Sequence, residues 1–425
     1  MSIPTAPPSG FRDFMPEQVA LRQDAVAVIT KVYKSFGFQP IATSAVEDLQ
    51  VLTGKGGGEN EKLIFKILKR GEALERAHTE KTDLADLGLR FDLTLPLARY
   101  YSKHGSLLPH PFKALQLGPV WRAERAQKGR YREFTQCDVD IIGADSWGAE
   151  VEVITAILTV FKTLGLSDVK VHLNDRAHVQ AELDAAAIPA EQQTQVCIEI
   201  DKLDKIGSDK VHESLVALIG AQKAELIGAR LIGQNAAAPE NLKTISNAIK
   251  AAVPDTHIEF DSSLMRGMGY YTGPVFEFRH ASLSGSLGGG GRYDKLTEKF
   301  GGPSIPACGG SIGFERLMLI LEEMGKHAAS AAPDAVVTVF SDDLRVKSLD
   351  AAAALRAKGL SVDVFPGGGK LKHQFKYADQ KKAAYALVIG PDEAAKGLVQ
   401  VKSLKTGDEK ALTLDEACAL IAARA

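Results

Sequence analysis

The arrangement of strands and helices changes character at one point of this 425-residue chain. Residues 324–334 are rich in small residues, as linkers are. Beyond them strand-like and helix-like segments alternate: strands at 335–340, 361–365 and 385–389, and helices at 344–358 and 371–382. A further strand is predicted at 399–404. This alternation builds βαβ units, so the pattern predicts an α/β domain with a mostly parallel sheet over residues 335–425.

The chain before the linker follows a different pattern. Residues 112–120 and 132–142 are strand-like and are separated only by a basic loop, and glycine-rich strand-like sequence returns over 257–313. Consecutive strands without intervening helices favour an antiparallel sheet with helices packed on it. Helices are predicted at 16–35, 151–164 and 314–323, whereas the charged, poorly periodic residues 70–86 are expected to form a mobile segment.

A compositional change marks residues 175–255, which are rich in Ala, Gln and Glu and contain neither Trp nor Tyr. This change predicts a helical insertion. Residues 1–174 and 256–323 are then expected to form one domain around it.

Charge and cysteine content exclude several classes of protein. With 51 Lys and Arg against 53 Asp and Glu, the chain lacks the strongly basic surface of a general nucleic-acid-binding protein, although a local basic face remains possible. The four cysteines contain no C-x-x-C pair, so neither a zinc knuckle nor a disulfide framework is expected. The N-terminal sequence does not resemble a secretory signal, and long apolar runs are absent, which favours a cytoplasmic protein without membrane spans.

The glycine-rich segments do not match the common nucleotide-binding loops. Gly288 to Asp294 is not a G-x-G-x-x-G sequence that opens a helix, and Gly367 to Lys370 lacks the Ser or Thr of a P-loop. A Rossmann dehydrogenase or a P-loop NTPase is therefore unsupported.

The segment from Trp121 to Gln136 combines cations with an aromatic ring. Its cations are Arg122, Arg125, Lys128, Arg130 and Arg132, and they accompany Phe134. Arginine forks bind phosphate oxygens and an aromatic face stacks on a base, so this set suits a nucleotide or an RNA end. The alternative interpretation is a solvated hairpin.

Polar side chains are expected to share faces in two extended segments. Asp92 and Thr94 lie two residues apart, as do Gln136, Asp138 and Asp140. Side chains two apart in a strand point the same way, so these could together hold an ammonium group or a cationic ring. A polar outer sheet face is the alternative.

Several motifs together resemble one family. In order they are Gly10-Phe-Arg-Asp-Phe14, Leu89-Arg-Phe-Asp-Leu-Thr94, the loop from Arg122 to Asp140, Arg266-Gly-Met-Gly-Tyr-Tyr271 and Gly313-Phe-Glu-Arg316. The chain with these motifs resembles the histidyl-tRNA synthetases, a family of class II aminoacyl-tRNA synthetases. Gln374-Phe-Lys-Tyr-Ala-Asp379 and Ala395-Lys-Gly397 resemble the anticodon-binding domain of that family.

The resemblance implies a fold and an activity. It implies an α+β catalytic domain with an antiparallel sheet over 1–174 and 256–323, a helical insertion over 175–255, a linker over 324–334 and an α/β anticodon-binding domain over 335–425. The implied reaction is ATP-dependent ligation of L-histidine to tRNA(His) through histidyl-adenylate. Mg²⁺ would accompany the ATP phosphates without a dedicated protein metal site, and a homodimer is expected.

The resemblance also implies roles for individual residues. The implied catalytic residues are Arg122, Arg266 and Arg316. ATP would be bound by Arg122 at the α-phosphate, Glu124 and Phe134 at adenine, and Arg316 at the γ-phosphate. Histidine would be bound by Asp92, Thr94 and Gln136 at its ammonium, by Asp140, Tyr270 and Tyr271 around its imidazole, and by Arg266 at its carboxylate. The implied tRNA contacts are Arg125, Lys128 and Arg130 in the catalytic domain and Lys370, Lys372 and Lys376 in a local basic segment of the C-terminal domain.

The sequence departs from the family pattern at two positions. Thr43 is followed by Ser44 where the family usually has Pro, and Gly269 stands where many members have Asp.

Two other interpretations of the resemblance are possible. A non-catalytic paralogue that senses histidine or tRNA as a regulatory subunit or domain would share the fold, but the presence of Arg122, Glu124 and Arg316 favours the enzyme. A different class II synthetase is disfavoured by the motif from Arg266 to Tyr271.

Overall fold

The computed structural model describes residues 3–53, 59–126, 129–232, 238–266, 270–283, 285–326 and 332–423. The chain divides into two compact units. The first comprises residues 1–14 and 22–326, and the second holds the remaining residues, 15–21 and 327–425.

A large, mainly antiparallel sheet forms the centre of the first unit. Its strand order is β1-β5-β6-β11-β10-β9-β7-β8. The strands are β1 (Gln39–Pro40), β5 (Phe112–Trp121), β6 (Glu133–Ile142), β7 (Lys170–Asp175), β8 (His257–Phe260), β9 (Pro274–Arg279), β10 (Gly288–Arg292) and β11 (Ala307–Gly313). The edge pairs β1–β5 and β7–β8 are parallel, and the pairs between them are antiparallel. The antiparallel sheet predicted from consecutive strands is confirmed.

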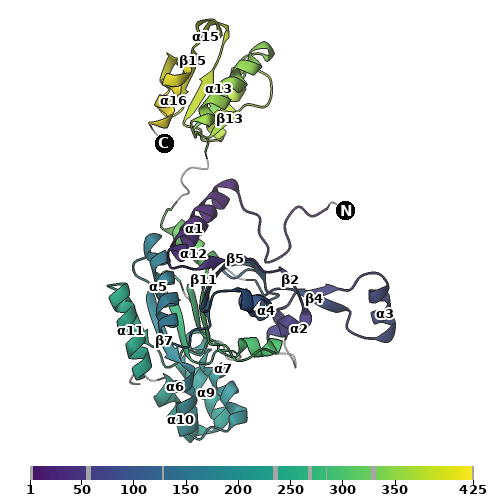
Figure 1. The fold of residues 1–425 in the computed structure, drawn as a ribbon, viewed down its shortest axis with the longest axis vertical. Helices are drawn as coiled ribbons and strands as arrows, with labels where there is room; N and C mark the ends of the chain where they lie inside the picture. Colours follow the sequence, from purple (N-terminus) through teal and green to yellow (C-terminus); the bar gives the residue numbers. More distant parts are fainter. Residues whose placement is uncertain are drawn as a thin grey trace. The chain divides into compact units, whose positions relative to one another are not determined.

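Helices pack on this sheet and bury its apolar residues. Helix α5 (Gly148–Thr163) packs on β11, α11 (Glu240–Ala252) packs on α5, and α12 (Phe314–Glu323) packs on β6. Helices α5 and α11 lie side by side in Figure 1. Phe161 of α5 meets the ring edge of Phe278 on β9, with 5.5 Å between ring centroids. Gly165 ends α5 with a φ of 88°, a conformation that glycine adopts at little steric cost.

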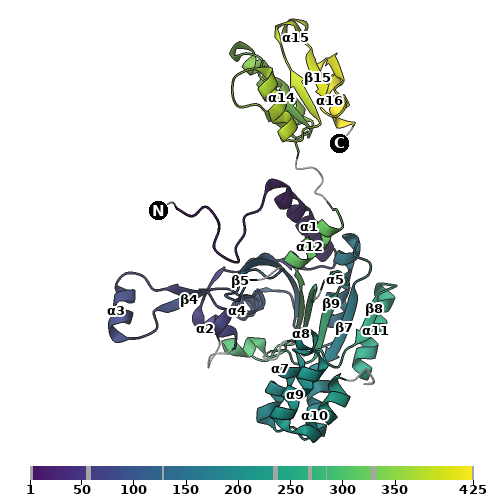
Figure 2. The same cartoon turned by 180° about the vertical axis from the view of Figure 1, so that it is seen from behind.

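The prediction of a mobile segment over residues 70–86 is wrong. These residues contain α3 (Glu72–Glu80) and the start of β4 (Ala85–Leu89), which pairs with β2 (Val46–Asp48) and β3 (Lys66–Leu68) in a small sheet. The end of the small sheet that carries α3 projects from the rest of the first unit in both views (Figures 1 and 2). Helix α3 is short, highly charged and buries only Ala77, so its composition resembles that of a loop although its few apolar residues fall at helical spacing.

The extended geometry predicted around Asp92 and Thr94 is also wrong. Thr94 is the first residue of helix α4 (Thr94–His104), and Asp92 Oδ1 accepts a hydrogen bond from the Leu95 amide at 3.0 Å. Pro96 fits the first turn of this helix because amides there need no partner within the helix. The shared strand face expected for Asp92 and Thr94 therefore does not exist.

The helices of residues 176–232 gather around a core of their own. They are α6 (Arg176–Ala185), α7 (Ala190–Ile200), α8 (Leu203–Ile206), α9 (Ser208–Ile219), α10 (Ala221–Ile227) and the π-helical turn Gly228–Ile232. Val196, Leu215 and Ile227 are fully buried there, and Met265 joins the same cluster. Figure 2 shows α7, α9 and α10 grouped at one end of the unit. The segment that leads to Arg266 is thus anchored on this helical group.

The second unit is a sheet between two layers of helices. Its strand order is β13-β12-β14-β15-β16. The strands are β12 (Ala335–Val337), β13 (Val362–Val364), β14 (Tyr385–Val388), β15 (Val399–Ser403) and β16 (Glu409–Leu412), and the helices are α13 (Arg345–Ala357), α14 (Leu371–Gln380), α15 (Pro391–Lys396) and α16 (Leu414–Ala422).

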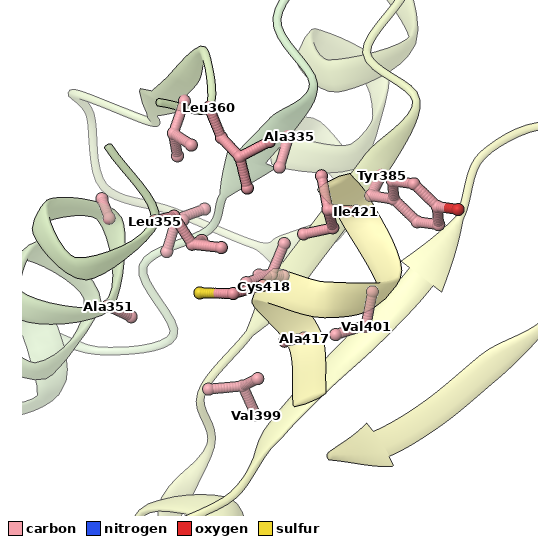
Figure 3. Close-up of a cluster of buried hydrophobic side chains, with 14 of the residues drawn as sticks. Ala335, Ala351, Leu355, Leu360, Tyr385, Val399, Val401, Ala417, Cys418 and Ile421 are labelled. Carbon is pink, nitrogen blue, oxygen red and sulfur yellow. The ribbon is translucent and has the colours of Figure 1, made fainter. Parts of the chain in front are cut away.

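Alternate residues of the strands face the two layers. Leu355 of α13 and Ile421 of α16 pack with Val399 and Val401 on one face, as Figure 3 shows. Val336 and Ala386 face the other way and pack with Ala378 of α14. The prediction of a mostly parallel sheet in this unit is correct for one half of the sheet and wrong for the other. Strand β12 pairs in parallel with β13 and β14, whereas β14–β15 and β15–β16 are antiparallel. A short turn joins β15 to β16, which leaves no room for the crossover that parallel strands need.

All four cysteines are free and buried. Among the described residues, no helix combines the length and apolarity that a membrane span requires.

A buried ion pair links the centre of the sheet to α5. Arg292 at the end of β10 donates from Nε to Glu150 Oε1 at 2.6 Å and from Nη2 to Oε2 at 2.7 Å. The Glu150 side chain is 1% exposed and that of Arg292 is 10% exposed. Arg292 also donates to the carbonyls of Ala144 and Ser146, so its charge is fully engaged.

We predict that Glu150→Ala lowers the free energy of unfolding of the first unit by about 3–5 kcal/mol, because it leaves a buried guanidinium without its counter-charge. Denaturant unfolding followed by tryptophan fluorescence measures this unit, since Trp121 and Trp147 both belong to it. Glu61→Gln is the matched control, because Glu61 pairs with Lys66 on the surface. Equal stability of the Glu150 variant and the control would contradict the prediction.

Candidate active site

A cavity of about 1150 Å³ opens in the first unit. One wall comes from the central sheet, with Gln136 of β6 and Ser311 of β11, and another comes from the helical group, with Gln195, Asp201 and Lys205. Typical small-molecule sites occupy roughly 300–1,000 Å³, so this cavity has room for a nucleotide and a second small ligand.

Most of the residues predicted to bind small molecules meet in this cavity. Those that line it are Arg122, Glu124, Phe134, Gln136, Arg266, Tyr270 and Arg316, and Arg130, which was predicted to contact tRNA, lines it too. The sheet brings these segments together from distant parts of the chain, because β6 lies beside β11 and β11 beside β10.

The other predicted residues that the structure describes do not line this cavity. Thr94 lines a separate small cavity, and Arg125 is exposed. Asp92, Asp140 and Tyr271 are also absent from the lining, although the Tyr271 ring lies 4.3 Å from that of Tyr270, which lines the cavity, between centroids. Lys128 lies outside the described residues, as does Gly269.

A row of polar side chains on β6 faces the interior beside the cavity. Gln136, Asp138 and Asp140 alternate along the strand, and their partners across the ladder on β11 are Gly313, Ser311 and Gly309. Within the described residues, Gln136 Oε1, Asp138 Oδ1 and Asp140 Oδ2 are buried without a hydrogen-bond partner. Unpaired buried acceptors cost roughly 1–3 kcal/mol each, so this row is suited to a ligand that brings N–H donors or positive charge.

Burial also changes how these carboxyls titrate. It raises the pKa of Asp138 well above its usual value, and the neighbouring Asp140 adds to this shift. Burial raises the pKa of Asp140 to about 7, while a hydrogen bond from Tyr293 opposes the rise. Burial likewise raises the pKa of Asp92. A cation bound among these carboxyls would favour their charged forms.

Tyr293 is a site residue that sequence reasoning missed. Its hydroxyl donates to Asp140 Oδ1, and its ring lies 6.2 Å from that of Tyr270 between centroids. Gly289 and Gly291 precede it at spacings of two, so strand alternation through the glycine run could have placed Tyr293 on the same face.

The glycines of β10 and β11 leave space for other side chains. A Cβ on Gly289 would lie 2.7 Å from Arg266 Nη1, and one on Gly291 would lie 3.0 Å from Tyr271 Cδ1. A Cβ on Gly309 would collide with Asp140 and lie 3.1 Å from the Tyr293 hydroxyl. The strands β10 and β11 therefore have no side chains at these positions, and the side chains of the site pack directly against their backbone.

The basic loop between β5 and β6 places its charges at the cavity. Arg122 Nε donates to the Phe91 carbonyl at 3.0 Å, and its guanidinium lies 5.0 Å from the centre of the Phe134 ring. Glu124 lies 3.6 Å from Arg130. The described parts of the loop on either side of residues 127–128 therefore contribute to the cavity wall, which argues against the solvated hairpin.

Arg266 and Arg316 both contact Ser286 at the cavity wall. Arg266 Nη1 lies 3.2 Å from Ser286 Oγ and 3.7 Å from Glu277 Oε1, and Arg316 Nη1 donates to the Ser286 carbonyl. Burial lowers the pKa of Arg316, and the positive charges of Arg130 and Arg266 lower it further. This concentration of positive charge favours an anionic ligand such as a phosphate chain.

Glu315 is a second residue whose role sequence reasoning missed. Its carboxylate accepts from Arg22 at 2.8 and 2.7 Å, from Arg12, and from the Thr135 amide at 3.3 Å. These bonds tie the start of α12 to β6 and to the N-terminal segment. Arg316, the next residue, is thereby held at the cavity.

The departure at Ser44 is accommodated locally. The Ser44 hydroxyl donates to the Val46 carbonyl at 2.6 Å, and Arg90 Nη1 donates to the carbonyls of Thr43 and Ser44 at 2.9 and 3.3 Å.

Comparisons with known proteins agree with this geometry. The family model described as histidyl-tRNA synthetase matches residues 10–317, and one described as an anticodon binding domain matches residues 334–424. Histidine--tRNA ligase from Leifsonia xyli subsp. xyli is 40% identical over 92% of this chain and 99% of that protein. The ligase from Cytophaga hutchinsonii is 36% identical over 96% and 97% of the two chains.

Solved structures of histidyl-tRNA synthetases share the fold of this chain. The crystal structure of histidyl-tRNA synthetase from Nostoc sp. PCC 7120 superposes with a TM-score of 0.81 at 28% identity and covers 100% of both chains. An ATP phosphoribosyltransferase regulatory subunit/histidyl-tRNA synthetase from Bacillus halodurans C shares the fold, with a TM-score of 0.70 at 23% identity. On the family model and the full-length relatives, this chain belongs to the histidyl-tRNA synthetase family.

Proposed function

We propose that this protein is a histidine–tRNA ligase. The histidine carboxylate attacks the α-phosphorus of ATP and pyrophosphate leaves, and a ribose hydroxyl of the terminal adenosine of tRNA(His) then attacks the acyl carbon and AMP leaves. One observation carries the proposal: buried, unpartnered acceptors on β6 lie beside a cavity whose other walls hold arginines. Histidine would bring a cationic ammonium group to the acceptors, and ATP would bring a phosphate chain to the arginines.

The ATP subsite is proposed to consist of Arg122, Glu124, Phe134 and Arg316, all of which line the cavity. Arg122 would bind the α-phosphate and Arg316 the γ-phosphate. Phe134 offers its ring to adenine, and Glu124 is an acceptor for the adenine amino group.

The histidine subsite is proposed to lie along β6. Gln136, with Asp92 and Thr94 near the start of α4, would receive the ammonium group. Asp140 would accept from an imidazole N–H, and Tyr271 would meet the other ring nitrogen, since neutral imidazole has one donor and one acceptor. Tyr270, which lines the cavity, would close the pocket over the ring.

Catalysis is proposed to rest on positioning and on charge stabilisation. Arg266 would contact the histidine carboxylate and the α-phosphate while negative charge accumulates around phosphorus. Arg122 and Arg316 would hold the phosphates in line.

The regulatory alternative is not favoured. A histidine sensor needs the pocket on β6 but has no use for an ATP subsite, and Arg122, Glu124, Phe134 and Arg316 all face one cavity here. The full-length relatives are also named as ligases.

Mg²⁺ is proposed to arrive with ATP. This ion binds through one or two carboxylates together with substrate phosphates. Glu277, which lines the cavity beside Arg266, fits that need. The ion would neutralise charge on the phosphates.

The small sheet supports a proposed homodimer. Its buried face holds Glu47 and Gly88, whereas Val46, Leu68 and Leu87 on the other face are 38%, 57% and 39% exposed. Exposed apolar side chains on one sheet face suit a contact with a second copy of the chain. We also propose a cytoplasmic location, in keeping with four free, buried cysteines.

The domain boundaries drawn from sequence are retained as a proposal, with the anticodon-binding domain at 335–425. Within it Lys370, Lys372 and Lys376 are exposed at the start and along the outer side of α14 and are proposed to contact tRNA phosphates. In the first unit Arg125 and Arg130, with Lys128, are proposed to contact the acceptor end.

The proposed function is tested by charging of tRNA. Purified protein is incubated with ATP, labelled histidine and a tRNA(His) transcript, and acid-precipitable label is counted. Label on tRNA(His) that depends on ATP supports the ligase. Histidine binding without charging would instead support the regulatory alternative.

We predict that Arg266→Ala lowers histidine-dependent ATP–pyrophosphate exchange by roughly 10²–10³-fold, because it removes a donor to charge that develops in the transition state. Arg230→Ala is the control, since Arg230 pairs with Glu182 in the helical group. An unchanged melting temperature would show that the protein stays folded. Near-normal exchange in the Arg266 variant would remove Arg266 from the mechanism.

We predict that Asp140→Asn raises the KM for histidine about 10–100-fold and the KM for ATP little, because a mismatched buried hydrogen bond to imidazole costs roughly 1–3 kcal/mol. The asparagine oxygen can still accept from Tyr293, so the pocket should stay intact. Asp168→Asn, at an exposed partner of His280, serves as control. Equal effects on both KM values would mean that Asp140 is structural.

We predict that the triple variant Lys370→Ala/Lys372→Ala/Lys376→Ala binds tRNA(His) more weakly and with a shallower salt dependence. The log–log slope should fall by roughly one unit for each phosphate that a lysine no longer neutralises. Filter binding over a range of salt measures both the affinity and the slope. Histidine-dependent exchange by this variant needs no tRNA and should persist.

A charge-matched control comes from the other helical layer of the same sheet. Lys347, Lys358 and Lys396 are exposed on or near α13 and α15, away from α14. Their triple alanine variant should keep the original salt slope. If both triple variants bound tRNA with equally reduced affinity, α14 would have no special role.

A further inference from the structure

Two of the proposed catalytic arginines meet on a single residue, Ser286. Arg266 Nη1 donates to its side-chain hydroxyl at 3.2 Å, and Arg316 Nη1 donates to its main-chain carbonyl. One residue thus contacts both guanidinium groups through different atoms. This residue was not singled out by any sequence motif.

The Ser286 hydroxyl is oriented to accept. It donates its one proton to the Gly288 carbonyl at 2.7 Å. A hydroxyl has a single donor and two acceptor lone pairs, so the lone pairs remain for Arg266. The direction of the Arg266 bond is therefore set by the backbone of β10.

The nearby carboxylate cannot set this direction alone. Glu277 Oε1 lies 3.7 Å from Arg266 Nη1, beyond hydrogen-bond length, and Glu277 Oε2 lies 3.7 Å from Arg279. Its side chain is 13% exposed, so it supplies charge to both arginines without fixing either one. Ser286 provides the directional contact.

The backbone around Ser286 is shaped to admit both guanidinium groups. A Cβ on Gly285 would lie 3.2 Å from Arg316 Nη1, and one on Gly289 would lie 2.7 Å from Arg266 Nη1. Burial lowers the pKa of Arg316, and the like charges of Arg130 and Arg266 lower it further. Arginines in such a group need fixed acceptors to keep a defined spacing.

We propose that Ser286 is a positioning residue that sets the spacing of Arg266 and Arg316, so that both can engage the phosphate chain of one ATP. The inference rests on the proposed function. The two contacts differ in kind, and this makes the proposal testable: replacing the side chain removes the contact to Arg266 and keeps the carbonyl that Arg316 uses.

Histidine-dependent ATP–pyrophosphate exchange is measured for Ser286→Ala and Ser286→Thr. We expect the maximal rate of the alanine variant to fall about tenfold, as for a hydrogen bond to a charged group, with the KM for ATP changed less than about twofold. The threonine variant keeps a hydroxyl and should recover most of the rate. Ser304→Ala, which removes an exposed hydroxyl bound to the Asp294 carbonyl, should behave as the unmodified protein.

A double-mutant cycle separates positioning from general damage to the site. Ser286→Ala should have little further effect in an Arg266→Ala background, whereas its effect should multiply with that of Arg316→Ala. A normal maximal rate for Ser286→Ala, or a full tenfold loss on top of Arg266→Ala, would overturn the inference while the proposed function stood. Absence of exchange in the unmodified protein would overturn the proposed function and the inference together.

Discussion

Buried hydrogen-bond acceptors that the protein leaves without partners are the constraint on which this site depends. Gln136, Asp138 and Asp140 stand in a row on β6, and each has a buried oxygen with no partner in the described residues. Such atoms oppose folding by roughly 1–3 kcal/mol each. The surrounding sheet must therefore hold them in place, and the ion pair between Glu150 and Arg292 shows how firmly β10 and α5 are joined.

Positive charges crowd together at another part of the cavity wall. Arg130 and Arg266 lie close enough to Arg316 to disfavour its charge. Ser286 accepts hydrogen bonds from Arg266 and Arg316, and the carboxylate of Glu277 lies 3.7 Å from Arg266. On the proposed function, one pair of substrates would relieve both the acceptors that lack donors and the cations that crowd together. An amino acid with an ammonium group and a ring N–H would satisfy the acceptors, and a phosphate chain would satisfy the cations. The site would thus be preorganised for adenylate formation.

Local patterns predicted much of the fold, and contacts between distant residues account for what they missed. Helix 314–323 was predicted with the bounds that α12 has, and the strands at 112–120 and 132–142 differ from β5 and β6 by one residue at an end, because apolar periodicity there is strong. The start of α4 was missed because Asp92 and Thr94 were interpreted as two residues on one face of an extended segment, whereas Thr94 begins the helix. Tyr293 with Asp140, and Glu315 with Arg12 and Arg22, are joined across more than 150 residues, and no local pattern encodes such contacts.

The acidic row on β6 is central because it is proposed to select one amino acid. ATP–pyrophosphate exchange measured with each of the twenty amino acids tests this selection most directly, since exchange requires only activation and no tRNA. We expect exchange with histidine and rates near background with the other nineteen. An exchange rate with any other amino acid that matches the rate with histidine would contradict the proposed selection. The absence of exchange with histidine would contradict it as well.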